Sequence, residues 1–254
     1  MKLDGKAAVV TGGSSGMGRA IALAYAKEGA KVLAVARRAE RLAKLVEESK
    51  DFPGEIIAYT ADISDKEKVE GMVDEAIKVF GKLDILINNA GIMDNMSMIG
   101  NASDEMYDKV FNVNVRAPFI AMRKAVNYFE TAGGGVIINI ASIGGLKGGA
   151  AGVTYTASKH AVIGMTKNTG FMYALKNIRC NAICPGAITT EIGTTENMKV
   201  LDQEGAARCG IGMALNPRFG EAEEVASTAV FLGSDESSFI NGQCIIVDGG
   251  WSAY

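Results

Sequence analysis

The feature that most constrains the fold is a regular alternation between short apolar runs and stretches with helical periodicity. Seven runs are rich in β-branched or apolar residues: 6–11, 31–36, 55–60, 83–88, 135–140, 178–184 and 243–248. Most are separated by segments such as 16–30, whose apolar residues recur every three or four positions. Strands that alternate with helices and are apolar nearly throughout are typical of parallel sheets covered on both faces. The sequence therefore predicts a doubly wound α/β fold with seven parallel strands.

The bulk properties are those of one globular domain spanning 1–254. A chain of 254 residues can bury a full core without metals or disulfides. The formal net charge of −3 offers no basic footprint for nucleic acid or an anionic membrane. No apolar run is long enough to span a membrane, and the N-terminus enters a strand at once. A single histidine, His160, and four cysteines without a C-x-x-C pair predict no metal site. We expect a reduced, cytoplasmic protein whose Cys180 and Cys184 are buried thiols.

Residues 187–219 break the alternation. They contain glycines at 193, 205, 210 and 212, two short apolar patches and no clear strand. An irregular insertion of this length between a strand and the next helix is usually functional or mobile. We predict that 187–219 forms a substrate-binding lid.

The stretch 11-TGGSSGMG-18 lies between the first predicted strand and the first predicted helix. Gly12, Gly16 and Gly18 have the spacing G-x-x-x-G-x-G, which does not match the usual dinucleotide fingerprint G-x-G-x-x-G. The helix that follows nevertheless directs its free N–H groups and its dipole toward the turn, where a pyrophosphate would fit. The alternative is a glycine turn that binds no ligand.

Two further elements have the side chains of an acid/base site. Tyr155 and Lys159 in 155-YTASK-159 lie one helical turn apart, and a nearby ammonium favours the phenolate form of tyrosine. Ser142 ends the strand 135-GVIINIAS-142, where ligands bind in doubly wound sheets. Taken singly, each has an ordinary explanation: a solvated helix face for the pair, and a turn residue for the serine.

Together these motifs resemble those of the short-chain dehydrogenase/reductase family over essentially the whole chain. The glycine stretch is similar to the family's TGxxxGxG, and 88-NNAG-91 follows the fourth predicted strand as in the family. Asn114 in 112-NVNVRAPF-119 matches the family's helix asparagine, and 185-PGAITT-190 resembles its PG motif. Ser142 stands thirteen residues before Tyr155, which with Lys159 fills Y-x-x-x-K.

The resemblance implies a Rossmann-type fold and a role for each matched residue. Tyr155 is the expected acid/base, and Ser142 orients the substrate oxygen. Lys159 holds the nicotinamide ribose and lowers the pKa of the tyrosine, while Asn114 holds a water that links Lys159 to solvent. The expected cofactor site comprises Gly12, Ser14, Ser15, Gly16, Met17, Gly18, Arg37, Arg38, Asp62, Ile63, Asn89, Ala90, Gly91, Tyr155, Lys159, Pro185, Gly186, Ile188 and Thr190.

The choice between NADP and NAD is predicted from the end of the second strand. An acidic residue there binds the ribose hydroxyls of NAD and repels a 2′-phosphate. This chain has Ala36 at that position, followed by Arg37 and Arg38. Since guanidinium groups pair with phosphate oxygens, we predict NADP over NAD, with Ser14 also near the 2′-phosphate. The alternative is that both arginines only begin a solvated helix.

Candidate substrate contacts are apolar. The predicted lid and the loop after 88–91 supply Met93, Met96, Met98, Ile99, Met198, Met213 and Leu215. Methionine adapts to large apolar ligands, although it also fills cores. We predict that Met93, Met198, Ser142 and Tyr155 bind a bulky apolar secondary alcohol or ketone, such as a hydroxysteroid. A 3-oxoacyl-thioester reductase and a catalytically silent nucleotide-binding regulator are the alternatives.

The resemblance further implies a homodimer or homotetramer assembled through paired long helices and the last strand. Trp251 and Tyr254 suit a subunit contact, or could cap the sheet edge within one chain.

Overall fold

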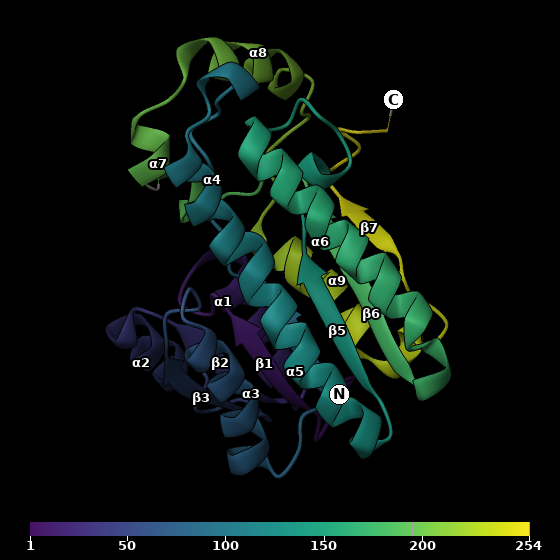
Figure 1. Cartoon of the computed structure of the whole chain (residues 1–254). Helices are drawn as coiled ribbons and strands as arrows, with labels where there is room; N and C mark the ends of the chain where they lie inside the picture. Colours follow the sequence, from purple (N-terminus) through teal and green to yellow (C-terminus); the bar gives the residue numbers. More distant parts are fainter. Residues whose placement is uncertain (195, 254) are drawn as a thin grey trace.

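The computed structural model describes residues 1–194 and 196–253, and its central element is one parallel sheet of seven strands (Figure 1). The strands lie in the order β3-β2-β1-β4-β5-β6-β7, which confirms the doubly wound fold. Each predicted strand is present, and no boundary differs from the prediction by more than two residues. The strands are β1 Ala7–Thr11, β2 Lys31–Ala36, β3 Glu55–Thr60, β4 Ile85–Asn88, β5 Gly135–Ile140, β6 Ile178–Pro185 and β7 Cys244–Val247.

Helices cover both faces of the sheet. One core cluster joins the sheet to α1, α2 and α9, and the other joins it to α3 and α5, with Met165 of α6 packed against it. The predicted helix over 16–30 ends earlier than expected, at Lys27. The helices are α1 Gly16–Lys27, α2 Ala39–Glu48, α3 Lys66–Phe80, α4 Asp104–Phe111, α5 Ala117–Ala132, α6 Val153–Met172, α7 Glu196–Lys199, α8 Gln203–Met213 and α9 Ala222–Gly233.

The order of the strands creates a switch point between β1 and β4. Consecutive strands step outward from β1 to β3 in one direction, and from β4 to β7 in the other. Ligands of doubly wound sheets bind beyond the carboxyl ends of the strands at such a point. The ends of β1, β4, β5 and β6 are therefore where a site is expected.

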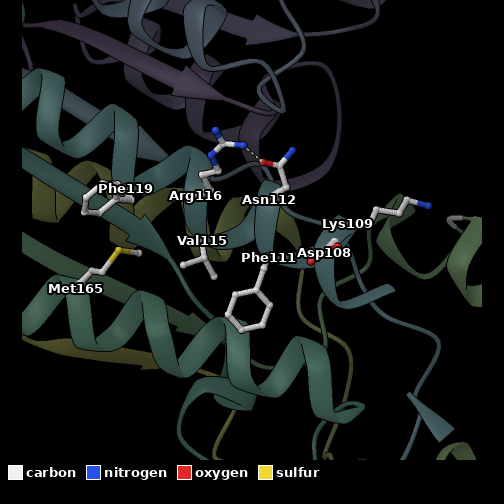
Figure 2. A pocket seen from close by; sticks show the side chains of 8 residues that line it. All are labelled: Asp108, Lys109, Phe111, Asn112, Val115, Arg116, Phe119 and Met165. Atoms are coloured by element: carbon white, nitrogen blue, oxygen red, sulfur yellow. Dashed lines mark hydrogen bonds between the residues drawn. The ribbon is translucent and has the colours of Figure 1, made fainter. Parts of the chain in front are cut away.

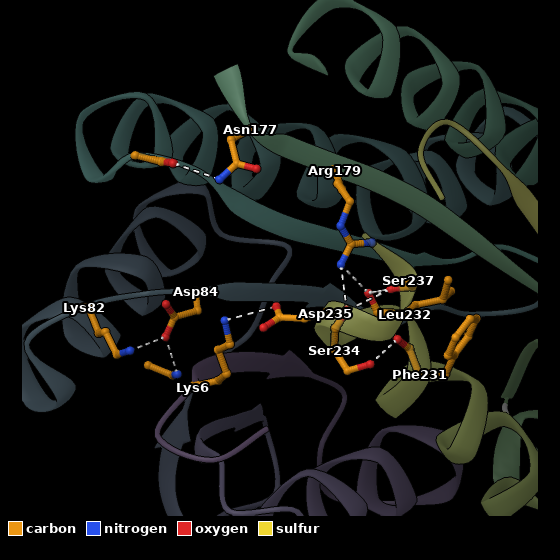
Figure 3. Close-up of polar contacts among 12 residues, drawn as sticks. Lys6, Lys82, Asp84, Asn177, Arg179, Phe231, Leu232, Ser234, Asp235 and Ser237 are labelled. Carbon is orange, nitrogen blue, oxygen red and sulfur yellow. Dashed lines mark hydrogen bonds and ion pairs between the residues drawn. The ribbon is translucent and has the colours of Figure 1, made fainter. Parts of the chain in front are cut away.

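At the opposite end of the sheet, where the strands begin, polar side chains bind backbone groups (Figure 3). At the start of β6, Arg179 donates to the carbonyls of Leu232 and Ser234 over 2.9 and 3.2 Å. Asp84 accepts from the backbone N–H of Ala7 over 2.7 Å, and so fixes the start of β1 beside β4. These contacts satisfy backbone groups at an edge where no ligand is expected.

The segment 187–219 is more ordered than the predicted irregular insertion. It contains a short 3-10 turn, η5 Glu191–Thr194, and the eleven-residue helix α8. Asp202 caps α8 by accepting from the N–H of Gly205 over 2.8 Å. Glycines at three positions in α8 lower helix propensity and hide its periodicity, which explains the error. Both α7 and α8 lie beyond the carboxyl ends of the strands (Figure 1).

Cys180 and Cys184 are buried free thiols, as predicted. Trp251 is also buried, and its indole N–H donates to the carbonyl of Gly212 over 2.8 Å, so it packs within its own chain. Tyr254 lies outside the described residues. Across 1–194 and 196–253, no helix is both long and apolar enough to cross a membrane.

Candidate functional site

The glycine loop after β1 packs tightly against the end of β4. Asn89 donates its side-chain N–H to the carbonyl of Thr11 over 2.8 Å, and the Thr11 hydroxyl accepts from the N–H groups of Asn89 and Ala90. Gly12 has φ +72°, and a Cβ there would lie 2.6 Å from Asn89 Nδ2. A Cβ on Gly18 would lie 2.4 Å from the carbonyl oxygen of Gly12. Glycine is therefore required at both positions by local packing.

The same loop has the properties of an anion site. Helix α1 begins at Gly16, and the side chain of its N-cap residue, Ser15, makes no capping hydrogen bond. The first N–H groups of the helix are thus left for another acceptor, and the helix dipole adds positive potential. The side-chain oxygen of Asn89 is buried without a hydrogen-bond partner among the described residues. The free N–H groups and the helix dipole fit the pyrophosphate of a dinucleotide, whereas the Asn89 oxygen needs a donor, such as a ribose hydroxyl.

A cluster of polar side chains lies beside the loop. Arg38, at the start of α2, donates to the hydroxyls of Ser15 and Ser14 over 2.7 and 3.3 Å. It also pairs with Glu191 over 3.0 Å, and Arg41 pairs with the same carboxylate over 2.5 Å. The two arginines hold the pKa of Glu191 below its usual value. The arrangement presents a guanidinium and two hydroxyls together, as a 2′-phosphate requires.

Arg37 lies apart from this cluster, beside another predicted cofactor residue, Asp62. Its guanidinium lies 3.9 Å from Asp62 and is largely exposed, so it does not join Ser14 and Arg38. Both arginines lie in the connection between β2 and α2, and their guanidinium groups contact different carboxylates. Asp62 in turn accepts from the N–H of Ser64 over 2.9 Å.

The remaining predicted cofactor residues lie around the same edge or pack beneath it. A Cβ on Gly16 would lie 3.1 Å from the Thr190 methyl, so the segment after β6 approaches the glycine loop. Pro185 ends β6, Gly186 donates to the carbonyl of Val247 over 3.0 Å, and Ile188 bridges to Gly220. Met17 and Ile63 pack against the two core clusters.

Three predicted catalytic side chains meet at the end of β5. Tyr155 and Ser142 share a side-chain hydrogen bond. The ammonium of Lys159 lies 5.4 Å from the centroid of the Tyr155 ring and donates to the carbonyl of Ile140 over 2.9 Å. Tyr155 and Lys159 are both buried. A phenol, a hydroxyl and an ammonium thus converge at the carboxyl edge of the sheet.

The predicted lowering of the Tyr155 pKa does not occur in this structure. Burial raises the pKa of Tyr155 to about 12; the hydrogen bond to Ser142 acts in the opposite direction, and Asp94 raises the pKa further. Burial also lowers the pKa of Lys159 to about 8. Desolvation disfavours the charged forms of both groups, and the ammonium donates to a backbone carbonyl rather than to the phenol.

Asn114 lies in a π-helical turn, Asn112–Arg116, between α4 and α5. Its side chain donates to the carbonyl of Ile92 over 2.9 Å and to the hydroxyl of Ser158 over 3.1 Å, and it accepts from the N–H of Ile92. A Cβ on Gly91 would lie 3.3 Å from Asn114 Oδ1 and 3.5 Å from Lys159 Nζ. Asn114 and Lys159 therefore face the same small space above Gly91.

A cavity of about 420 Å³, which we call the α8 cavity, lies between α8, the loop after β4 and the start of α6. Met96 and Met98 line it, whereas Met93 and Met198 do not. Val153 and Thr156, which flank Tyr155 in the helix, belong to the lining, as does Arg208. Ser142 and Tyr155 are also outside the lining, so none of the four expected substrate contacts borders this cavity.

Sequence reasoning missed three charged residues. Asp94 is a buried carboxylate that accepts from the N–H of Tyr155 over 2.9 Å. Glu191 bridges to Arg38, and Arg208 lines the α8 cavity. The one available signal was the position of Asp94 in an apolar stretch three residues after 88-NNAG-91.

A second cavity of about 610 Å³ lies on the outer face of α4, α5 and α6 (Figure 2). Phe111, Val115, Phe119 and Met165 supply its apolar side chains, and Arg116 donates to Asn112 at its edge over 3.3 Å. It shares none of its lining with the predicted site.

Known proteins match this chain over nearly its whole length. A family model described as enoyl-(acyl carrier protein) reductase matches residues 12–252. The chain is 46% identical to the 3beta-hydroxysteroid dehydrogenase 2 of Eggerthella lenta, covering 99% of this chain and 96% of that protein. It is 38% identical to the 3-oxoacyl-[acyl-carrier-protein] reductase FabG of Thermotoga maritima, over 98% of this chain and 99% of that one.

Solved structures of related proteins have the same fold over nearly the whole chain. The crystal structure of levodione reductase has a TM-score of 0.88 at 36% identity, covering 99% of this chain and 100% of the other. A putative NAD(P) dependent gluconate 5-dehydrogenase from Beutenbergia cavernae, with bound NADP, has a TM-score of 0.87 at 35% identity, covering 100% and 99% of the two chains.

Proposed function

Because the chain belongs to the short-chain dehydrogenase/reductase family, and so is an oxidoreductase acting on alcohol or ketone groups, we propose an NADP(H)-dependent enzyme for a bulky apolar substrate such as a hydroxysteroid. The observation that carries this proposal is the convergence of Ser142, Tyr155 and Lys159 beside a glycine loop that fits a pyrophosphate. A retained set of acid/base residues gives no support to a silent regulator.

Tyr155 transfers the proton. In ketone reduction the phenol donates its proton to the forming alkoxide, while the hydroxyl of Ser142 donates a hydrogen bond to the same oxygen. In alcohol oxidation the deprotonated form of Tyr155, the phenolate, would accept the hydroxyl proton. The nicotinamide of the bound cofactor would supply or accept the hydride. Since burial raises the pKa of Tyr155 to about 12, the phenol is protonated at neutral pH, ready for reduction.

Lys159 and Asn114 serve the proton path. The Lys159 ammonium is held by the Ile140 carbonyl near the Tyr155 ring, where it also suits the hydroxyls of a nicotinamide ribose. Asn114 faces Lys159 across Gly91, and a water at that point would pass protons to solvent. We assign these two residues to proton relay and to cofactor positioning.

NADP is favoured over NAD by the polar cluster at the start of α2. Arg38, Ser14 and Ser15 offer one cation and two hydroxyls to a 2′-phosphate, and no carboxylate ends β2. Glu191 neutralises part of this charge. The preference for NADP over NAD therefore depends on whether the 2′-phosphate displaces the Glu191 carboxylate from Arg38. The relative from Beutenbergia cavernae with bound NADP supports the assignment.

The substrate proposal rests on the α8 cavity and on the relatives. Its methionines and Ile211 form an apolar surface beside the helix that carries Tyr155. We assign 187–219 to a lid within one domain, 1–254, because Glu191 contacts the cofactor end and α8 covers this cavity. The identity of 46% to a 3beta-hydroxysteroid dehydrogenase supports assaying the 3β-hydroxyl first.

The second candidate is reduction of a 3-oxoacyl thioester, favoured by the 38% identity to the 3-oxoacyl-[acyl-carrier-protein] reductase. Steady-state assays with a steroid panel and with an acetoacetyl thioester separate the two. Turnover of 3β-hydroxysteroids or their ketones with NADP(H) is the expected result. Turnover of the thioester alone would overturn the substrate proposal while leaving the family unchanged.

We also assign a homodimer or homotetramer in a reducing cytoplasm. The apolar face around Phe119 and the exposed Phe171 and Leu175 supports self-association, and the four free thiols support the compartment. Light scattering tests the oligomer, and a monomer would refute it.

A further inference from the structure

Asp94 is a buried carboxylate that the proton path does not use. Its side chain is 1% exposed. One oxygen accepts from the N–H of Tyr155 over 2.9 Å, and the other accepts from the N–H of Met96 over 3.0 Å. A buried charge is costly unless hydrogen bonds compensate it, so a carboxylate held here by two backbone donors needs an explanation.

The helix that carries Tyr155 has no cap of its own. Helix α6 has Gly152 at its N-cap position, and no acidic residue lies in its first turn. Tyr155 is the third residue of the helix, and the third N–H is the one that an N-cap side chain usually satisfies. A Cβ on Gly152 would lie 2.5 Å from the Asp94 carboxylate. Asp94 therefore occupies the capping position from another part of the chain, in space that glycine leaves open.

The segment around Asp94 also contacts the predicted lid. Met96 has φ +63°, a conformation that non-glycine residues seldom adopt. Its carbonyl is so close to Gly205 of α8 that a Cβ there would lie 2.0 Å away. The carbonyl of Asn95 accepts from the N–H of Asp202 over 2.9 Å, and that of Ser97 accepts from Val153 over 2.9 Å. Residues 94–97 thus lie between α8 and the start of α6, and they form hydrogen bonds with the N-cap of α8 and with the first turn of α6.

We propose that Asp94 is a positioning residue that caps α6 from the loop after β4 and so fixes Tyr155 relative to the substrate side of the site. The inference rests on the proposed function, because it assigns a role through Tyr155. It accounts for both hydrogen bonds of the carboxylate, for the glycine at 152 and for the strained Met96.

The charge of Asp94 adds an electrostatic effect on Tyr155. Lys159 faces the phenol from the next turn of α6, and Ser142 faces it from the end of β5. Cys209 of α8 lies near Asp94, and Cys184 of β6 lies near Lys159. After burial, Asp94 is the group that raises the pKa of Tyr155, so it favours the protonated phenol. Removing this charge should lower the pKa of Tyr155 and so shift the pH profile of the reaction to lower pH.

Two variants separate the cap from the charge. Asp94→Asn removes the charge and keeps one acceptor for a backbone N–H, whereas Asp94→Ala removes both. With saturating NADP and a turned-over alcohol, we expect Ala to lower kcat about 10- to 100-fold, since small misplacements of reacting groups have effects of this size. We expect Asn to keep kcat within about 10-fold and to shift the pH profile of oxidation down by about 0.5–1 unit.

Asp65→Ala is the matched control. Asp65 caps α3 by accepting from the N–H groups of Glu67 and Lys68 over 2.9 and 3.3 Å, but α3 carries no predicted catalytic residue. It should lower Tm while leaving kcat and the pH profile unchanged. Hydrogen exchange of the Tyr155 amide, measured without cofactor, should be at least about 10-fold faster in Asp94→Ala than in the wild type and unchanged in Asp65→Ala.

The outcomes distinguish this inference from the proposed function. Unchanged exchange at Tyr155, or an Asp94→Ala variant whose kcat and pH profile match those of the Asp65 control, would refute the positioning role. If the wild type turns over no alcohol or ketone, the proposed function fails, and exchange at Tyr155 still tests the cap.

Discussion

Replacing Arg38 by alanine tests the cofactor assignment at a single side chain. Arg38 donates to Ser15 and Ser14 and pairs with Glu191, and its side chain is 40% exposed. We expect the variant to lose affinity for NADP but not for NAD, because only NADP has a 2′-phosphate to pair with the guanidinium.

The magnitude follows from these contacts. A hydrogen bond to a charged partner is worth about 1.5–3 kcal/mol, and the exposure of Arg38 favours the lower end of that range. The pair with Glu191 lies at the surface and contributes about 0–1 kcal/mol, which offsets little of the loss. A net loss of about 1.5–2 kcal/mol corresponds to a roughly 10- to 30-fold higher KM for NADP. Glu191→Gln, which removes the competing carboxylate, should lower that KM by about 2- to 5-fold.

The assay compares KM for NADP and for NAD in the wild type, Arg38→Ala, Glu191→Gln and a control. Lys44→Ala removes a similar charge from an exposed position of α2 and should change neither constant. A wild type that prefers NAD, or an Arg38→Ala variant that loses affinity for both coenzymes equally, would refute the assignment of Arg38 to the 2′-phosphate.

Two further changes probe the buried groups of the site. Lys159→Met should flatten the pH dependence of stability: the pKa of Lys159 is about 8 in the folded chain against an ordinary 10.5, so the wild type gains stability as pH rises between these values. Denaturant unfolding at pH 7 and pH 10 should differ by about 2–3 kcal/mol less in the variant, and an unchanged difference would show that this lysine is not desolvated. Gly18→Ala should abolish coenzyme binding and lower Tm, because its Cβ would lie 2.4 Å from the Gly12 carbonyl; equilibrium binding of NADPH at wild-type affinity would contradict the tight packing of this loop.

The fold and the centre of the site could be predicted because they depend on local signals. A strand buried on both faces is an apolar run, and parallel strands bring their ends to one edge. Strand and helix positions made Ser142 and Lys159 candidates, and the order of the motifs along the chain gave them their predicted roles. Of Ser14, Arg37 and Arg38, which were predicted to lie together, Ser14 and Arg38 are hydrogen-bonded to each other.

The errors depend on contacts between distant parts of the chain. Asp94 accepts a hydrogen bond from the Tyr155 N–H, 61 residues away in the sequence, and Glu191 pairs with Arg38, 153 residues away. The only local signal is the position of Asp94 in an apolar stretch after 88-NNAG-91, and no local pattern marks Glu191. Helix α8 was missed because its glycines, one of them packed against Met96, obscure its periodicity. The pKa of Tyr155 was misjudged because burial, which a sequence does not display, raises it, and because the Lys159 ammonium donates to a backbone carbonyl rather than to the phenol.

The central claim is that Tyr155 is the acid/base of an NADP-dependent alcohol oxidoreductase. Its most direct test is to measure kcat for a 3β-hydroxysteroid and the Kd for NADPH with the wild type and with Tyr155→Phe, side by side. We expect the variant to lose about 10²–10⁴-fold in kcat while its Kd stays within about 3-fold, since only the transferable proton is removed. A Tyr155→Phe variant that turns over within a few-fold of the wild type would contradict the account.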